Sequence, residues 1–310
     1  MNEKELIKLI EQMSEAGLIY NEEEEYYTNE GAPSWNAVRK AEQLEDTSFI
    51  PFLNDLLEKS KDIEMRKNIY FILGKIGNNT GDERVVNILL KCLEVEMNKY
   101  ILESVLDGIA DQKNIPDYSP LIKFLDDKRH SVRHRVIRTL SRCNHREVED
   151  ALIKVIDKSQ DQYDLQYAGG SLSNIGTSKS IPHLIRLLNR VKGDTKCVTL
   201  YALEVLGNST LLPIFMEAME DRSPAVKSSA LSGILKYGDE TAVDIVYKRV
   251  KTVLARKRKI ESYELVPAFE FLMRYKENNE KIKKLFEWIK LKKWDCLVEE
   301  EKDWHQNNVN

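Results

Sequence analysis

A regular repeat of apolar residues runs through most of the chain. From Met65 to Gly77, apolar or small residues occupy relative positions 0, +4, +8 and +11, and this pattern returns at intervals of roughly 33 residues. The residues at +8 are apolar in every copy: Leu73, Leu106, Leu140, Leu172, Leu206, Ile234 and Leu272. A fixed period of this length is typical of proteins in which one structural unit is stacked repeatedly on the next.

Each repeat is predicted to contain two helices. The +4, +8 and +11 spacing places the apolar residues on one face of a helix. A second apolar block follows in each copy, and we expect it to form a second, antiparallel helix; examples are residues 89–93, 121–125, 152–156 and 184–188. One such hairpin has too little apolar area to fold alone, so the hairpins must share one continuous core.

The pattern resembles the HEAT-repeat family, in particular its short bacterial form with the core V-R-x-x-A-x-x-x-L-G-x-I-G. The resemblance rests on Val132-Arg133, the segment Val226 to Ala230 and the segment Leu73 to Gly77. It implies an all-α, armadillo-like fold, a right-handed α-solenoid of about eight antiparallel hairpins. It also implies that the second helices line a concave surface. The family further implies that the arginine of the V-R pair, here Arg133, contacts the neighbouring repeat.

Three segments are expected along the chain. Residues 1–32 form a capping helix and an acidic linker containing Glu22 to Glu25, residues 33–292 form the solenoid, and residues 293–310 form a C-terminal helix end and polar tail. In the last segment, Trp294 and Trp304 either cap the final repeat or serve as aromatic anchors for a partner.

Composition points to a cytoplasmic protein with no membrane association. No apolar stretch is long enough to span a bilayer, and the charged residues among the first twenty argue against a signal peptide. The four cysteines show no C-x-x-C pair and are expected to be reduced. We expect a monomer.

No common catalytic motif is present, so we expect no catalytic residues, cofactor or metal. The sequence lacks G-x-x-x-x-G-K-[ST], G-x-S-x-G and H-E-x-x-H. None of the five histidines precedes a glutamate, which excludes helical-repeat hydroxylases that use His-Glu pairs. Asp164 and Glu264 occupy normally apolar repeat positions; each is either an acid at an active site or a side chain that contacts a neighbouring helix end.

Basic side chains form two candidate partner-binding sets. Arg135, Arg138 and Arg142 are predicted to share one exposed stripe of a first helix. The other set takes the same position in successive second helices and is expected to form a basic ladder on the concave wall: Lys91, Lys123, Lys154 and Arg186. Either set is a solvated surface, a site for an acidic protein or a site for nucleic acid.

Function is therefore expected to lie in binding. The leading hypothesis is a non-enzymatic scaffold or adaptor that binds a protein partner, which the basic residues suggest is acidic, along the concave face. The first alternative is a nucleic-acid-binding protein, related to DNA repair, that uses a basic surface. The second is a phycobilin-lyase-like protein, because the short HEAT form also occurs in those enzymes.

Overall fold

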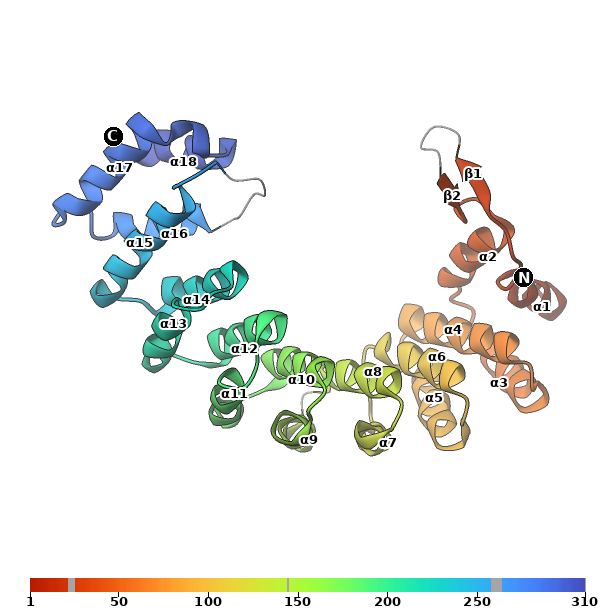
Figure 1. Cartoon of the computed structure of the whole chain (residues 1–310). Helices are drawn as coiled ribbons and strands as arrows, with labels where there is room; N and C mark the ends of the chain where they lie inside the picture. The colour runs from red at the N-terminus through yellow and green to blue at the C-terminus, as the bar shows by residue number, and fades with distance from the viewer. Residues whose placement is uncertain (22–25, 144, 258–263, 310) are drawn as a thin grey trace. The chain divides into compact units, whose positions relative to one another are not determined.

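The chain folds almost entirely into helices (Figure 1). The computed structural model describes residues 1–21, 26–143, 145–257 and 264–309. The chain divides into two compact units, Met1–Ile175 and Gly176–Asn310, called unit 1 and unit 2 below. Within the described residues, every helix is too short or too polar to cross a membrane.

Unit 1 contains one short β-hairpin among its helices. In chain order its elements are α1 (Glu3–Gln12), β1 (Ile19–Asn21), β2 (Tyr26–Thr28), α2 (Pro33–Glu42), α3 (Phe49–Lys59), α4 (Ile63–Thr80), α5 (Glu83–Val95), α6 (Lys99–Ala110), α7 (Ser119–Lys123), η1 (Phe124–Asp126), α8 (His130–Leu140), α9 (Arg146–Lys158) and α10 (Gln162–Ile175).

Unit 2 is helical throughout its described residues. Its elements are η2 (Ser178–Ser180), α11 (Ile181–Leu188), α12 (Gly193–Leu206), η3 (Ser209–Leu211), α13 (Leu212–Ala218), α14 (Pro224–Tyr237), η4 (Glu240–Ala242), α15 (Val243–Val253), α16 (Leu265–Met273), α17 (Glu280–Lys292), η5 (Trp294–Cys296) and α18 (Glu299–Asn308).

The apolar repeat forms the core, as its spacing predicts. The +4 residues have no exposed surface: Ile69, Leu102, Val136, Ala168, Ala202, Ala230 and Ala268. The +8 residues are buried too, except Leu206, which is half-buried at the end of α12. Polar side chains start several of these helices; Asp62, for example, accepts a hydrogen bond from the Met65 backbone N–H and caps α4. The all-α solenoid of HEAT-like repeats is therefore confirmed.

The order of helices within a hairpin is the reverse of the expected order. In unit 1, α9 packs on α10 and α5 on α6, while η1, which continues α7, packs on α8. In unit 2, α11 packs on α12 and α13 on α14. The helices with the V-R and V-K residues, α8 and α14, are thus the second of their hairpins, whereas α4, which has the L-G residues, packs against both α3 and α5. The periodicity marks the buried face of each helix, but it does not say which neighbour closes the hairpin.

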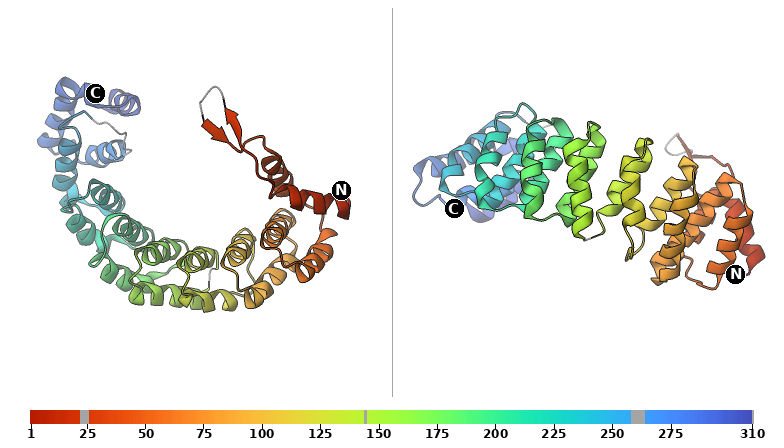
Figure 2. Two further views of the ribbon diagram at one scale, coloured as in Figure 1. Left: turned by 45° about the vertical axis from the view of Figure 1, so that its right-hand side comes forward. Right: turned by 90° about the horizontal axis from the view of Figure 1, so that it is seen from below.

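This order reverses the expected roles of the two helix rows in unit 1. We call α4, α6, α8 and α10 the inner row, and α3, α5, α7 and α9 the outer row (Figures 1 and 2). Neighbours in the inner row pack directly against one another. In the outer row, pockets of about 870 and 590 Å³ open beside α3 and α5 and beside α7 and α9. Unit 1 therefore bends toward the inner row, which is its concave side.

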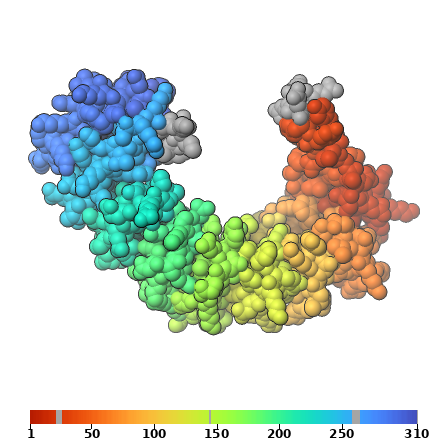
Figure 3. Space-filling view, viewed as in Figure 1, coloured from red at the N-terminus to blue at the C-terminus, as the bar shows by residue number. Residues whose placement is uncertain are grey.

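The spaces between neighbouring inner-row helices are filled by side chains (Figure 3). A close approach occurs between α4 and α6, where a Cβ atom built on Gly74 would lie 2.9 Å from the Cα atom of Gly108. Two glycines at this crossing allow the backbones to meet. This contact explains the glycine that follows the +8 leucine in the first repeat.

The two ends of the chain are capped differently. α1 buries Leu6, Leu9 and Ile10 against α2 and α4. The strands β1 and β2 pair antiparallel, Ile19 opposite Thr28, where the sequence analysis expected a linker; its acidic run, residues 22–25, lies outside the described residues. At the other end the ring of Trp304 lies 5.4 Å from that of Phe269 and 6.2 Å from that of Phe286. These contacts favour the capping role for Trp304. The proposed segment boundaries stay a prediction.

Candidate functional site

The residues of the predicted ladder lie on outer-row helices in unit 1. Lys91 on α5, Lys123 at the end of α7 and Lys154 on α9 are all exposed. Lys123 Nζ lies 3.7 Å from Glu94 Oε1, while Lys91 and Lys154 each line one of the two pockets. Arg186 belongs to unit 2, where its Nη2 atom lies 2.8 Å from Nδ1 of His183. The lysines therefore face the convex side of unit 1, not its concave side.

The three arginines of the predicted stripe have different surroundings. Arg135 reaches α6, where its guanidinium lies 3.1 Å from Asp107 and 3.6 Å from Glu103. Arg138 is exposed, with its guanidinium carbon 5.9 Å from the centre of the Tyr167 ring. Arg142 is also exposed, but it lies beyond the end of α8, which stops at Leu140. Arg135 thus joins two repeats, while Arg138 and Arg142 make no ion pair with any described residue.

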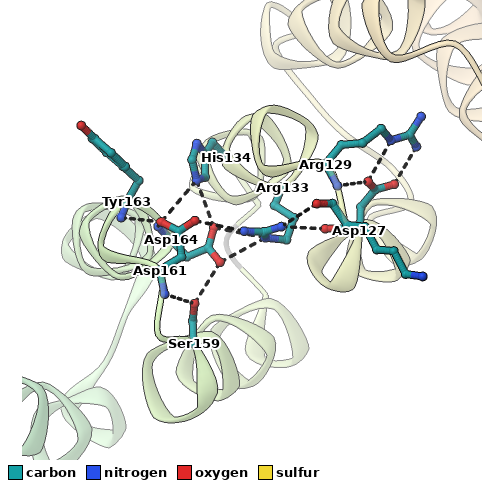
Figure 4. Close-up of polar contacts among 9 residues, drawn as sticks. Asp127, Arg129, Arg133, His134, Ser159, Asp161, Tyr163 and Asp164 are labelled. Carbon is teal, nitrogen blue, oxygen red and sulfur yellow. Dashed lines mark hydrogen bonds and ion pairs between the residues drawn. The ribbon is translucent and has the colours of Figure 1, made fainter.

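Arg133 contacts the neighbouring repeat, as its place in the V-R pair predicts. Its Nη1 donates hydrogen bonds to the backbone oxygens of Asp127 (2.9 Å) and Lys128 (3.3 Å). Its Nε lies 3.1 Å from Asp164 Oδ2 and its Nη2 lies 3.2 Å from Asp161 Oδ2 (Figure 4). Arg133 therefore ties the loop before α8 to the start of α10.

Asp164 serves as the buried acceptor of this network. Its side chain is 7% exposed, and it accepts a further hydrogen bond of 2.9 Å from the Ser159 hydroxyl. The other polar repeat position behaves alike: Glu264 accepts two hydrogen bonds of 3.0 Å from Arg249. Both contacts favour the interpretation that these acids reach a neighbouring structural element.

His134 brings a nitrogen ligand beside the same two carboxylates. Its Nε2 atom lies 3.1 Å from Asp164 Oδ1 and 3.8 Å from Asp161 Oδ1. Burial lowers the pKa of the imidazole, although the nearby negative charges of Asp164 and Asp161 oppose that shift. Burial also opposes ionisation of Asp161, but backbone N–H groups of Tyr163 and Asp164 hold the pKa of this carboxyl below its usual value. The imidazole thus favours its neutral form beside an ionised carboxylate.

Aromatic rings from α8 and α10 lie beside His134. The ring centroid of His134 lies 5.1 Å from that of Tyr167, 5.9 Å from that of Tyr163 and 5.7 Å from that of His130. Tyr163 is 62% exposed, and Tyr100 on α6 is 57% exposed. The inner row of unit 1 therefore presents tyrosines together with the exposed Arg138.

A related network in the first repeat shows that the arginine position is structural. Arg66 donates to the backbone oxygens of Leu57 and Ser60 and forms an ion pair with Glu96. The buried Tyr70 hydroxyl donates to the same carboxylate over 2.6 Å. Burial raises the pKa of Tyr70, which keeps this hydroxyl protonated as a donor. Here no histidine joins the carboxylate, so the His134 cluster is not a general feature of the repeats.

The His134 cluster was not predicted from the sequence. The repeat pattern marked Asp164 as an unusual acid at an apolar position, but it did not connect this residue to His134 or Asp161. The repeat period contained a signal for this cluster. Stacking of the repeats places the first turn of a helix in one repeat beside the start of the corresponding helix in the next repeat. His134 and Asp164 lie 30 positions apart in the sequence, close to one full repeat.

Comparison with known proteins supports the repeat assignment. The model of the family described as HEAT repeats matches residues 118–204, from the start of α7 into α12. A comparison with curated proteins finds no match.

Two solved structures resemble the fold at low sequence identity. A crystal structure of an engineered protein is 14% identical, with a TM-score of 0.52 over 100% of this chain and 89% of that chain. The complex of CpcE and CpcF of phycocyanin lyase from Nostoc sp. PCC7120 is 16% identical, with a TM-score of 0.46 over 77% of this chain and 93% of that chain. The match to HEAT repeats covers residues 118–204, and the buried repeat positions continue the same packing pattern through the other described parts of the chain.

Proposed function

We propose that the chain is a non-enzymatic scaffold that binds an acidic protein segment along the inner row of unit 1. The observation that carries the proposal is the exposure of Tyr163 and Arg138 on either side of Tyr167, with ring centroids of the two tyrosines 6.5 Å apart and the Arg138 guanidinium carbon 5.9 Å from the Tyr167 ring; Tyr100 on α6 is exposed as well. Tyrosine and arginine are enriched among the residues that dominate the energetics of protein interfaces. Arg138 makes no ion pair with a described residue, so its charge is available to a carboxylate of the partner.

A protein partner is favoured over nucleic acid because part of the expected positive charge is neutralised within the fold. Arg135 is paired with Asp107 and Glu103, and Lys123 lies close to Glu94. Affinity for a nucleic acid depends mainly on cations that remain available to phosphates. The phycobilin-lyase alternative stays a prediction, and incubation with a bilin and its apoprotein tests it.

The test is a tagged pull-down from native lysate at moderate salt, with and without nuclease. We expect a stoichiometric protein that survives nuclease with the unmodified chain. The double variant Arg138→Glu/Tyr163→Ser should lose it, because both changes remove exposed contacts from the inner row. The matched control, Lys123→Glu/Lys154→Glu on the outer row, should keep it.

The opposite pattern would assign binding to the ladder. If the lysine variant loses the protein while the inner-row variant keeps it, the proposed surface is wrong. If nuclease releases the bound material, the chain binds nucleic acid. In that case, affinity should fall steeply with salt, by about 0.9 log units per log unit of salt for each phosphate neutralised.

A further inference from the structure

Three metal-ligating side chains from two repeats converge at the start of α10. His134 projects from α8, Asp161 immediately precedes α10, and Asp164 lies in its first turn (Figure 4). One ligand atom from each of the three lies within 4.8 Å of the other two. No metal site is expected from the sequence, since these residues match no short motif. Stacking of the repeats is what brings them together.

The geometry around His134 is that of two ligands and not of a donor with its acceptor. His134 Nε2 is buried and has no hydrogen-bond partner among the described residues, although Asp164 Oδ1 is only 3.1 Å away. Both atoms can therefore be directed at a common third point. Ligands at about 2.0–2.1 Å from a tetrahedral zinc ion are separated by about 3.3 Å.

We propose that His134, Asp161 and Asp164 bind a divalent transition-metal ion of the zinc class. One imidazole nitrogen and two carboxylate oxygens are a donor set that suits zinc, whereas calcium and magnesium prefer oxygen ligands alone. The Asp161 side chain is 32% exposed, so solvent reaches this edge of the site and supplies the fourth ligand.

Arg133 and Ser159 act as orienting groups in this arrangement. The closest contacts of Arg133 are with the Oδ2 atoms of Asp161 and Asp164. Ser159 also donates a hydrogen bond to Oδ2 of Asp164. In each carboxylate, Oδ1 is the atom nearer to His134. A carboxylate has acceptor sites for several partners, so binding Arg133 does not prevent it from ligating an ion. Such outer contacts hold ligands in position and tune metal affinity.

The charges around the cluster also suit a divalent cation. The two aspartates and Arg133 together carry a net charge of −1, and the neutral imidazole of His134 adds none. A bound divalent ion changes this net charge to +1, shared over the four side chains. Metal binding requires the neutral form of histidine. The ring centroids of Tyr163 and Tyr167 lie 5.9 and 5.1 Å from that of His134, so both rings form part of the wall of the site.

The experiment is a calorimetric titration of the chelator-treated, full-length protein with zinc, combined with the visible absorption of bound cobalt. We expect one equivalent of zinc and cobalt bands of tetrahedral intensity. His134→Ala should weaken zinc binding by at least about 100-fold, a loss no smaller than those seen when outer contacts of metal ligands are removed. The matched control His183→Ala, which removes an imidazole from unit 2, should bind zinc like the unmodified chain.

A second variant guards against loss of folding. Asp161→Asn keeps a side-chain oxygen that can accept the hydrogen bonds from Tyr163 and Asp164 at the start of α10. It should retain the helical circular dichroism signal and still lose the cobalt bands. The proposal is overturned if the unmodified chain binds no zinc, if His134→Ala and Asp161→Asn bind it unchanged, or if His183→Ala causes an equal loss.

Discussion

Gly74 and Gly108 meet at the crossing of α4 and α6. A Cβ atom on Gly74 would lie 2.9 Å from the Cα atom of Gly108, a distance that real Cβ atoms essentially never show. The obstacle is backbone, which cannot rotate away as a flexible side chain can. The spacing of these two inner-row helices is therefore set by the absence of side chains at this point.

Gly74→Ala should destabilise the chain by about 1–3 kcal/mol, the usual cost of overpacking a close contact. Urea unfolding followed by circular dichroism measures the change. Ser104→Ala, on the solvent-facing side of α6, is the matched control and should shift stability by less than about 0.5 kcal/mol. Equal midpoints for the two variants would contradict the close helix crossing.

Arg133→Met should be the most destabilising arginine substitution considered. It removes the partner of Asp161 and Asp164 and leaves two carboxylates in a partly buried site. Loss of one member of a buried ion pair costs about 3–5 kcal/mol. Arg142→Met, at an exposed position, is the control, and urea unfolding should place it within about 0.5 kcal/mol of the unmodified chain. A small effect at Arg133 would show that the network is dispensable.

Charge reversal should lower the stability of the chain more at Arg135 than at Arg138. Arg135→Glu places a third carboxylate beside Asp107 and Glu103, so it should destabilise the chain by about 1 kcal/mol, since the pair is partly exposed. Arg138→Glu should change stability by less than about 0.5 kcal/mol. Thermal unfolding at low and high salt measures both, and the Arg135 effect should shrink as salt screens it. Identical behaviour of the two variants would contradict the different surroundings of the two arginines.

His305 should make unit 2 less stable as the pH falls. The imidazole is 1% exposed and its Nε2 lies 3.2 Å from the Phe286 backbone oxygen. Burial lowers its pKa in the folded state, so the unfolded chain takes up this proton first. The stabilisation is full above the unfolded pKa of about 6.5, and it is lost as the pH falls from there toward the folded pKa, by up to about 1.36 kcal/mol per pH unit.

The matched variant for this effect is His305→Gln, which keeps an N–H donor but does not titrate. Tryptophan fluorescence reports mainly on unit 2, because three of the four tryptophans follow residue 280. Unfolding measured with chelator between pH 7 and 5 should show a smaller slope for the variant than for the unmodified chain. Parallel slopes would mean that another group controls stability in this range.

The sequence by itself determined the helices and their buried faces. The apolar residues at +4 and +8 predict which side of each helix enters the core, and Val136 and Leu140 lie there without exposed surface. The V-R pair also predicted that Arg133 contacts the next repeat. The buried faces follow from periodicity, because a side chain's direction around a helix depends only on its spacing along the chain, whereas the Arg133 contact is implied by the resemblance to HEAT repeats.

Only the tertiary structure decided which helices pair and which residues meet across repeats. α4 packs against both α3 and α5, so its apolar face is shared between two neighbours, and the hairpin order could not be read from the pattern. For the same reason the ladder lysines fell on the convex side of unit 1. The pairing of Arg135 with Asp107 and the meeting of His134 with Asp161 and Asp164 depend on the offset between stacked helices, which side-chain packing sets.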